Sequence, residues 1–164
     1  MENGRILVSE NNGTYVLKFV GDVRLTLCAT LDDFLESMCQ SSLLNTILID
    51  LSETEGIDST SLGLLAKISV LARKKHQLTP VIISTNQDIT RILESMGFDK
   101  VFVILDSHTS TVEQLRELPI VEGNEALVHA KVLEAHKILM EMNESNKETF
   151  RDLVYTLEGD CKHN

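Results

Sequence analysis

The sequence predicts an α/β fold in which a mostly parallel β-sheet is covered by helices. Two apolar segments, residues 5–9 and 14–20, are joined by Asn11-Asn12-Gly13, a strong signal for a hairpin turn. Beyond them, short β-branched runs alternate with segments whose apolar residues repeat at helical spacing. Two strands followed by such repeats are typical of a sheet whose later strands run parallel, with helices as the crossovers.

The helices and strands of the alternation follow in order along the chain. Four helices are expected, at residues 25 or 29 to 41, 60–75, 86–97 and 110–118. Asn86 is a suitable N-cap for the third helix and Gly97 ends it. The fourth begins with the capping-box spacing Ser110-Thr111-Val112-Glu113. Further strands are expected at residues 45–51, 81–84 and 100–105.

A second segment, residues 119–164, follows the predicted α/β domain of residues 1–118. Residues 119–124 have the composition of a linker. Apolar residues then recur at steps of three and four, which predicts a C-terminal α-helical extension with one apolar seam; they are Val128, Val132, Ala135, Leu139 and Met142, continued by Phe150, Leu153 and Leu157.

The bulk composition fits a small regulatory protein of the cytoplasm. The chain has 164 residues, 43% of them hydrophobic, and a net charge of −10. That charge argues against nucleic-acid binding and permits steering toward a basic protein surface. The sequence lacks an apolar run long enough to enter a membrane and the features of a signal peptide at its N-terminus. Cys28, Cys39 and Cys161 include no Cys-x-x-Cys pair, so a reducing compartment is the simplest inference.

Signals for catalysis or for a cofactor are weak. Five histidines are scattered through the chain, and although His129 and His136 are two helical turns apart, no third ligand completes a metal set. Neither a Walker-type loop nor a Gly-x-Gly-x-x-Gly motif occurs. We therefore expect no enzyme activity, no metal and no cofactor.

The most informative segment is the junction between the strand at residues 45–51 and the helix at residues 60–75. A polar loop containing Gly56 is expected after the strand, and Asp58, Ser59, Thr60 and Ser61 come where the helix begins. Such residues are preferred N-caps, so the hydroxyl groups need have no role beyond capping. The alternative is a regulatory phosphoserine, because free N–H groups at a helix start can hold a phosphate.

This junction resembles a known family signature. Asp58-Ser59-Thr60-Ser61-Leu62-Gly63, after a strand ending in Asp50-Leu51, is similar to the Asp-Ser-Ser/Thr-Gly-Leu-Gly pattern of STAS-domain anti-sigma-factor antagonists. Three other segments, residues 19–23, 80–84 and 92–98, resemble that family in the same order and spacing, so the resemblance covers residues 5–118 and implies a STAS-like sheet. Ser61 departs from it, replacing the usual glycine and adding a second hydroxyl.

The resemblance implies a phosphorylation-gated partner switch. In that family a partner kinase phosphorylates the serine that matches Ser59, and a PP2C-type phosphatase resets the switch. The unmodified form would bind an anti-sigma factor or serine kinase, and the phosphorylated form would release it or exchange it for a second partner. The implied partner-binding residues are Asp22, Asp58, Ser59, Thr60, Ser61, Leu62 and Gly63, with Asp50 expected at the same sheet edge as Asp22.

Two alternatives to this switch remain at the level of sequence. The chain could be a constitutive STAS scaffold or transport-associated subunit, in which Ser59 only caps its helix, or a sensor of a small ligand such as a nucleotide. The sequence also leaves the role of the C-terminal seam undecided. Either the seam packs back on the domain or forms a homodimer, or it docks a partner helix or occludes the surface near Ser59.

Overall fold

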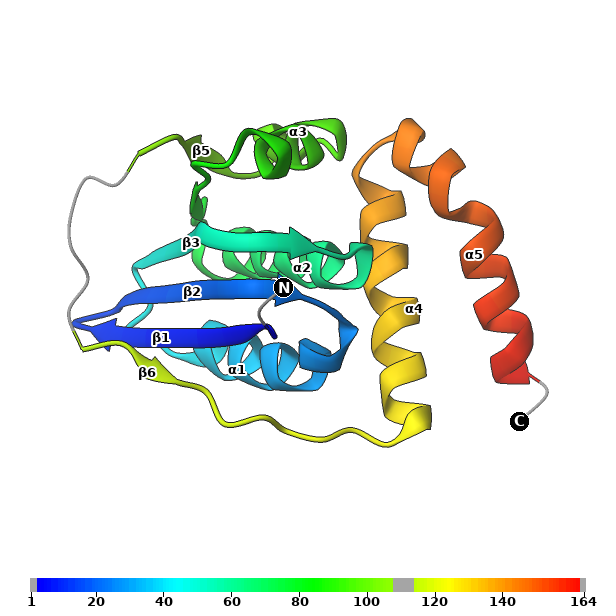
Figure 1. Cartoon of the computed structure of the whole chain (residues 1–164), viewed down its shortest axis with the longest axis horizontal. Coiled ribbons are helices and arrows are strands. Elements are labelled where there is room, and N and C mark those ends of the chain that lie inside the picture. The colour runs from blue at the N-terminus through cyan, green and yellow to red at the C-terminus, as the bar shows by residue number, and fades with distance from the viewer. Residues whose placement is uncertain (1–2, 108–113, 163–164) are drawn as a thin grey trace.

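The computed structural model describes residues 3–107 and 114–162, and it confirms the α/β class (Figure 1). Within these residues six strands form one sheet in the order β5-β4-β3-β2-β1-β6. β1 (Arg5–Asn11) and β2 (Thr14–Val23) make the predicted hairpin through Asn12 and Gly13, both at positive φ. β3 (Thr46–Ile57), β4 (Val81–Ile83) and β5 (Val103–Leu105) each pair in parallel, and β6 (Arg116–Glu117) pairs antiparallel with β1.

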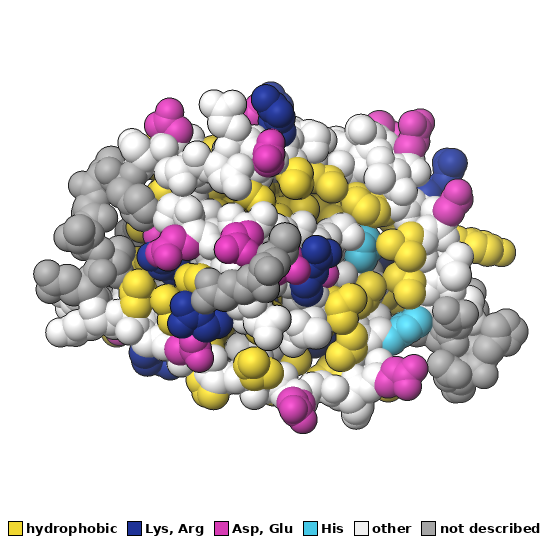
Figure 2. Space-filling model, viewed as in Figure 1, with side chains coloured by type: hydrophobic (Ala, Val, Ile, Leu, Met, Phe, Trp, Pro, Cys, Tyr) yellow, Lys and Arg dark blue, Asp and Glu magenta, His cyan; other side chains and the backbone are white. Residues whose placement is uncertain are grey.

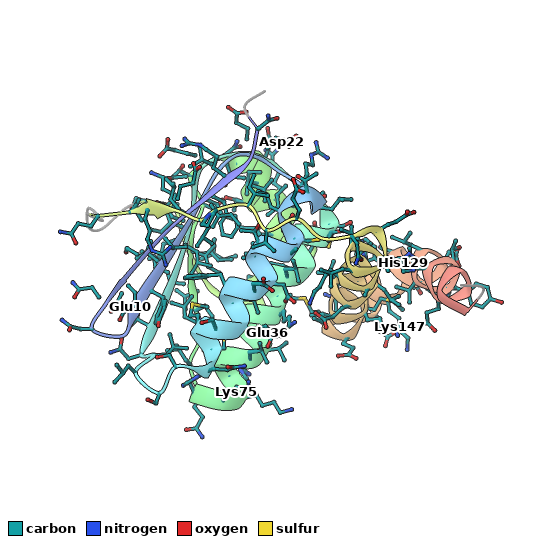
Figure 3. All side chains as sticks on the ribbon, turned by 90° about the horizontal axis from the view of Figure 1, so that it is seen from below. Glu10, Asp22, Glu36, Lys75, His129 and Lys147 are labelled. Carbon is teal, nitrogen blue, oxygen red and sulfur yellow. The ribbon has the colours of Figure 1, made fainter. Side chains whose placement is uncertain are left out.

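The helices of the domain are α1 (Cys28–Gln40), preceded by the 3-10 turn η1 (Leu25–Leu27), α2 (Ser59–His76), and α3 (Gln87–Ser95), followed by η2 (Phe98–Lys100). The C-terminal extension forms α4 (Glu125–Met142) and α5 (Glu144–Lys162). Seen along the sheet, α1 and α2 form a layer on one of its faces, α4 lies beyond that layer, and α5 lies outermost (Figure 3). The helix α2 is therefore enclosed between the sheet and α4.

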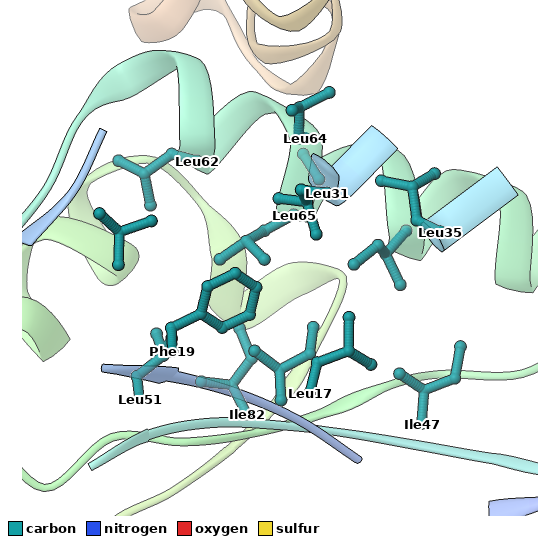
Figure 4. Close-up of a cluster of buried hydrophobic side chains, with 14 of the residues drawn as sticks. Leu17, Phe19, Leu31, Leu35, Ile47, Leu51, Leu62, Leu64, Leu65 and Ile82 are labelled. Carbon is teal, nitrogen blue, oxygen red and sulfur yellow. The ribbon is translucent and has the colours of Figure 1, made fainter. Parts of the chain in front are cut away.

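The hydrophobic core lies between the sheet and the layer of α1 and α2 (Figure 4). Side chains from the sheet meet those from the helices there; those labelled are Leu17, Phe19, Ile47, Leu51 and Ile82 from the strands and Leu31, Leu35, Leu62 and Leu65 from the helices. Leu64 points away from this cluster, toward α4, and is also fully buried. The helix α2 thus buries apolar side chains on both of its sides.

Two sequence predictions are wrong at the ends of elements. The expected polar loop at residues 52–56 is the second half of β3, because β2 continues beside it and pairs Gly21 with Thr54 and Val23 with Ile57. The capping box at residues 110–113 lies outside the described residues. The helix expected to reach Leu118 is contradicted at its end, because residues 116–117 form β6 and the Leu118 N–H donates to the Ile6 carbonyl at 2.8 Å.

A smaller correction concerns the strand expected to begin at residue 100. The chain makes a 3-10 turn at η2 first and enters β5 only at Val103. Gly97, at φ 86°, ends the preceding helical segment as predicted and turns the chain so that Phe98 is buried. The buried aromatic ring fixes this turn, and it stacks on Phe102 with ring centroids 5.3 Å apart.

The C-terminal helices pack back on the domain. Asn124 caps α4 by accepting a hydrogen bond from the Leu127 N–H at 2.8 Å. Ala135 and Leu139 of the predicted seam are fully buried, and they belong to the same hydrophobic cluster as the residues of the sheet. The extension is therefore continuous with the core of the domain, and it covers the N-terminal half of α2.

Candidate functional site

The start of α2 is capped by Asp58. One carboxylate oxygen accepts a hydrogen bond from the Ser61 N–H at 2.9 Å, and the other accepts one from the Leu25 N–H at 2.8 Å. The Asp58 N–H in turn donates to the Val23 carbonyl at 3.1 Å. Asp58 therefore joins the end of β2 through its backbone, and the turn η1 and the first turn of α2 through its side chain. Because Asp58 supplies the cap, the hydroxyl of Ser59 is not needed for that purpose.

Ser59 is the first residue of α2, and its hydroxyl contacts a histidine from α4. The Ser59 Oγ lies 2.8 Å from Nε2 of His136, and Nδ1 of the same ring lies 2.7 Å from the Val132 carbonyl oxygen. A carbonyl can only accept, so Nδ1 carries a proton, and in the tautomer whose single proton is on Nδ1 the other nitrogen, Nε2, is an acceptor. The Ser59 hydroxyl therefore donates to His136, a residue that is 2% exposed.

The ring of His136 is also held from its other side. It packs edge-on against Phe150 of α5, with ring centroids 5.2 Å apart and an interplanar angle of 65°. Both C-terminal helices thus take part in placing the acceptor beside Ser59. A buried ring with both nitrogens paired and one flank packed has a fixed orientation, so this contact is specific.

The remaining residues of the predicted signature are covered in this structure. Thr60 and Ser61 are buried in the first turn of α2, and Leu62 points into the core between helix and sheet (Figure 4). Gly63 lies directly under α4: a Cβ added to it would be 2.6 Å from the Ala135 Cβ and closer still to the Ala135 carbonyl oxygen. The absence of a side chain at Gly63 permits the two helices to cross at backbone contact.

Asp22 lies near Asp58, whereas Asp50 does not. Asp22 pairs with Gly56 at the end of β2, and both of its carboxylate oxygens accept from Nε of Arg24 at 2.9 Å. Asp50 is paired with Lys18, four residues earlier on β2, so it lies about 13 Å away along the strand. The buried Asp50 carboxylate accepts from the Ser52 N–H at 2.9 Å, which makes it part of β3 rather than of the candidate site.

A cluster of charged side chains joins α1, α2 and α4 beside the crossing. Nζ of Lys67 lies 2.8 Å from Asp32, 2.8 Å from Glu36 and 2.7 Å from Glu134, and Lys131 forms a second ion pair with Asp32. Burial lowers the pKa of Lys67, but its hydrogen bonds to the three carboxylates outweigh that effect and raise the pKa above its usual value. Lys67 is therefore a charged group at the centre of this contact.

Hydrogen bonds hold the linker and the far end of α4 against the domain. The Val121 N–H donates to the Thr30 hydroxyl at 2.8 Å, ahead of α4. At the turn between α4 and α5, the side-chain amides of Asn143 and Asn146 donate to the Met96 carbonyl at 3.2 and 2.9 Å. The position of α4 across α2 is thus set at both of its ends.

Other candidate chemistry is not assembled in the described residues. Cys28 and Cys39 are buried free thiols, and burial raises the pKa of Cys39 to about 11. Within residues 3–107 and 114–162, no group of three His, Cys, Asp or Glu side chains is placed to hold a metal ion. None of the helices described is both long and apolar enough to cross a membrane.

The STAS domain family model matches residues 5–114, which is more than half of the chain. The chain therefore belongs to the STAS domain family, as the resemblance at residues 58–63 predicted. Among solved structures, that of the anti-sigma factor antagonist SpoIIAA in its unphosphorylated form has a similar fold, with a TM-score of 0.54 and 12% identity over 63% of this chain and 89% of that chain. No curated protein matches the sequence.

Sequence reasoning did not assign His136 to the site. It is 77 residues from Ser59 along the chain and lies in the extension, beyond the residues matched by the family model. The apolar seam that contains Ala135 was the one available signal, because it predicted that this helix packs against something. Which residues of the domain it packs against depends on the tertiary fold.

Proposed function

We propose that the chain is an anti-sigma-factor antagonist that acts as a phosphorylation-gated partner switch, with Ser59 as the phosphorylated residue. The observation that carries this proposal is the position of Ser59: it is the first residue of α2 in a STAS domain, and Asp58 already supplies the cap. Its hydroxyl is therefore not required as a helix cap.

The start of α2 is also a favourable place for a phosphate. The N–H groups of Ser59 and Thr60 precede the first intrahelical hydrogen bond, which the Leu62 N–H donates to the Asp58 carbonyl. A phosphate of about −1.5 to −2 charges at this position is favoured by the helix dipole, while the Asp58 carboxylate opposes it. The modification would therefore leave α2 folded and change the charge at its N-terminal end.

Release of the partner on phosphorylation, called charge gating here, follows from the cost of burying an unpaired charge. An unmodified Ser59 face, made of Asp22, Asp58 and the first turn of α2, would bind an anti-sigma factor or a serine kinase. Phosphorylation would place a dianion in that interface, at a cost of several kcal/mol when it is desolvated without a partner. Each 1.4 kcal/mol weakens binding tenfold, so a cost of several kcal/mol lowers the affinity by orders of magnitude. A PP2C-type phosphatase would restore the unmodified form.

The first experiment is phosphosite mass spectrometry on the protein isolated from its native cells, with bound proteins identified in the same sample. Phosphate on Ser59, together with partners that differ between the two forms, supports the switch. An unmodified Ser59 and one constant partner under several growth conditions would favour the constitutive scaffold. A ligand that raises the melting temperature of the unmodified chain would favour the small-ligand sensor.

Variants of the same residue test the mechanism. Ser59→Asp is expected to lose the partner and Ser59→Ala to keep it, with the α/β domain folded in both. Ser95→Asp, an acid placed at an exposed hydroxyl of α3, is the matched control and should bind as the wild type does. Normal binding of the unmodified partner by Ser59→Asp would disprove charge gating.

A further inference from the structure

The helices α4 and α5, called here the arm (residues 125–162), cover the face of α2 that holds Ser59. We propose that the arm is an exchangeable cover: it occupies this face in the unmodified chain, and phosphorylation of Ser59 or a competing partner helix unseats it. This inference rests on the proposed function for its trigger and goes beyond it by naming what the partner must displace.

The helices α2 and α4 cross at very close range. Gly63 and Ala135 bring the two backbones together, and Leu64 points from α2 toward the arm. The fit depends on small residues at one point and would be lost if either helix gained a side chain there. A contact of this kind is seated or unseated as a unit, because packed interfaces do not deform continuously.

Ser59 is itself part of the contact between α2 and the arm. Its hydroxyl donates to His136 across 2.8 Å, which leaves no room for a phosphoryl group between the two atoms. When a kinase transfers phosphate from ATP, the Oγ–P bond forms as the bond from the γ-phosphorus to ADP breaks, and the hydroxyl proton is lost. The donor to His136 then no longer exists, and a bulky dianion faces a buried imidazole.

Part of the contact between the arm and the domain consists of ion pairs. Lys67 forms an ion pair with Glu134 of the arm, and Lys131 of the arm forms an ion pair with Asp32 of α1. These ion pairs lie beside the apolar contacts of Ala135 and Leu139, and interfaces between units of one chain that include such polar contacts commonly allow the units to move. Apolar and histidine side chains are also visible on the surface where the arm adjoins the domain (Figure 2), so this contact reaches solvent along one edge.

The arm also indicates what kind of partner fits the face. It presents an α-helix with a small residue, Ala135, at the crossing and a carboxylate, Glu134, within 2.7 Å of Lys67. A competing partner is expected to present the same chemistry: a helix with a small residue opposite Gly63 and an acidic side chain that reaches Lys67. Burial of Leu64 by that helix would replace the burial lost from the arm.

Hydrogen exchange with mass spectrometry on the full chain tests the cover. The variants are Ser59→Asp, Gly63→Ala and, as the matched control, Gly159→Ala, where an added Cβ meets nothing within 4 Å. An acid at the first position of a helix is favourable, and Ala is a better helix residue than Gly, so α2 should stay folded. We expect the arm amides to exchange about tenfold faster or more in the first two variants, with sheet amides unchanged.

Each outcome of this experiment either supports or overturns the proposal that the arm is an exchangeable cover. Wild-type or greater protection of the arm in Ser59→Asp would overturn the proposal, as would faster exchange of the whole chain in both test variants. The result is separable from the proposed function. Phosphate found on Ser59 with an arm that stays protected in Ser59→Asp would leave the switch standing without the cover. An arm released by both variants, with Ser59 never phosphorylated in cells, would leave the cover standing with a partner helix as its trigger.

Discussion

Replacing Lys67 with Met would remove the cation at the centre of the buried charge cluster. Glu36 and Glu134 have side chains 43% and 44% exposed, so water screens them and each pair contributes only about 0–1 kcal/mol. Asp32 is 2% exposed and would keep a single cation, Lys131. Breaking a buried pair costs about 3–5 kcal/mol, and because Lys131 remains we expect about 3 kcal/mol.

Urea unfolding followed by circular dichroism measures this cost. Lys137→Met, which removes an exposed 3.4 Å pair with Glu158, is the control and should cost less than about 1 kcal/mol. The double variant Lys67→Met/Asp32→Leu leaves no unpaired buried carboxylate and should recover most of the loss. If Lys67→Met were no more destabilising than Lys137→Met, the cluster would be screened by solvent and the reasoning would fail.

The same charge cluster makes the stability of the folded protein depend on pH, and the sign of this dependence can be derived. The pKa of Lys67 is raised in the folded state. The stability that Lys67 contributes to the fold is therefore fully present below the pKa of the unfolded chain, about 10.4, and is lost as the pH rises through the pKa of the folded chain. Wild type should therefore lose more stability than Lys67→Met as the pH rises above about 10.4. Equal slopes for the two proteins in that range would contradict the assignment.

Two further predictions concern the cap and a thiol. Asp58→Ala should lower the free energy of unfolding by about 1–2 kcal/mol, and Asp58→Asn by less because one oxygen acceptor remains, as urea titration can rank. Cys39, whose pKa burial raises to about 11, should react with a thiol reagent at pH 8 only when the protein is unfolded; rapid reaction of the native chain would refute this. Since the folded pKa is the higher one, wild type should also lose stability between about pH 9 and 11, and Cys39→Ala should not share that loss.

Local signals in the sequence were sufficient for the elements that depend on local chemistry. The hairpin follows from Asn12 and Gly13 at positive φ, and the starts of α2 and α3 follow from the side chains of Asp58 and Asn86, each of which accepts from a backbone N–H of its own helix. These contacts span two or three residues. Such features can be predicted without knowledge of the fold.

Two of the wrong predictions depend on pairing with distant residues. The polar second half of β3 has turn-like composition, yet it forms a strand because β2 lies beside it and Thr54 donates to the Phe19 carbonyl, 35 residues away. β6 is only two residues long and exists because β1 offers a free edge. In both cases backbone hydrogen bonds to a neighbouring strand outweighed the local propensity of the sequence, as is common in β-sheets.

The candidate site was predicted only in its N-terminal half. Asp58 and Ser59 could be identified from the junction alone, whereas His136 and the ion pair of Lys131 with Asp32 join residues 77 and 99 positions apart. Periodicity predicts that a helix has an apolar seam, but it does not say which surface receives it. The contact between α4 and α2 is a property of the assembled chain.

The enclosure of α2 on two sides has a consequence for the behaviour of the protein in solution. Leu64, fully buried under the arm, would be exposed with its neighbours if the arm left and nothing replaced it. Contiguous apolar surface of this kind promotes association between copies. Solubility at high concentration therefore depends on a seated arm or a bound partner, and a fragment that ends at residue 118 would be expected to aggregate even though it contains every residue that the family model matches.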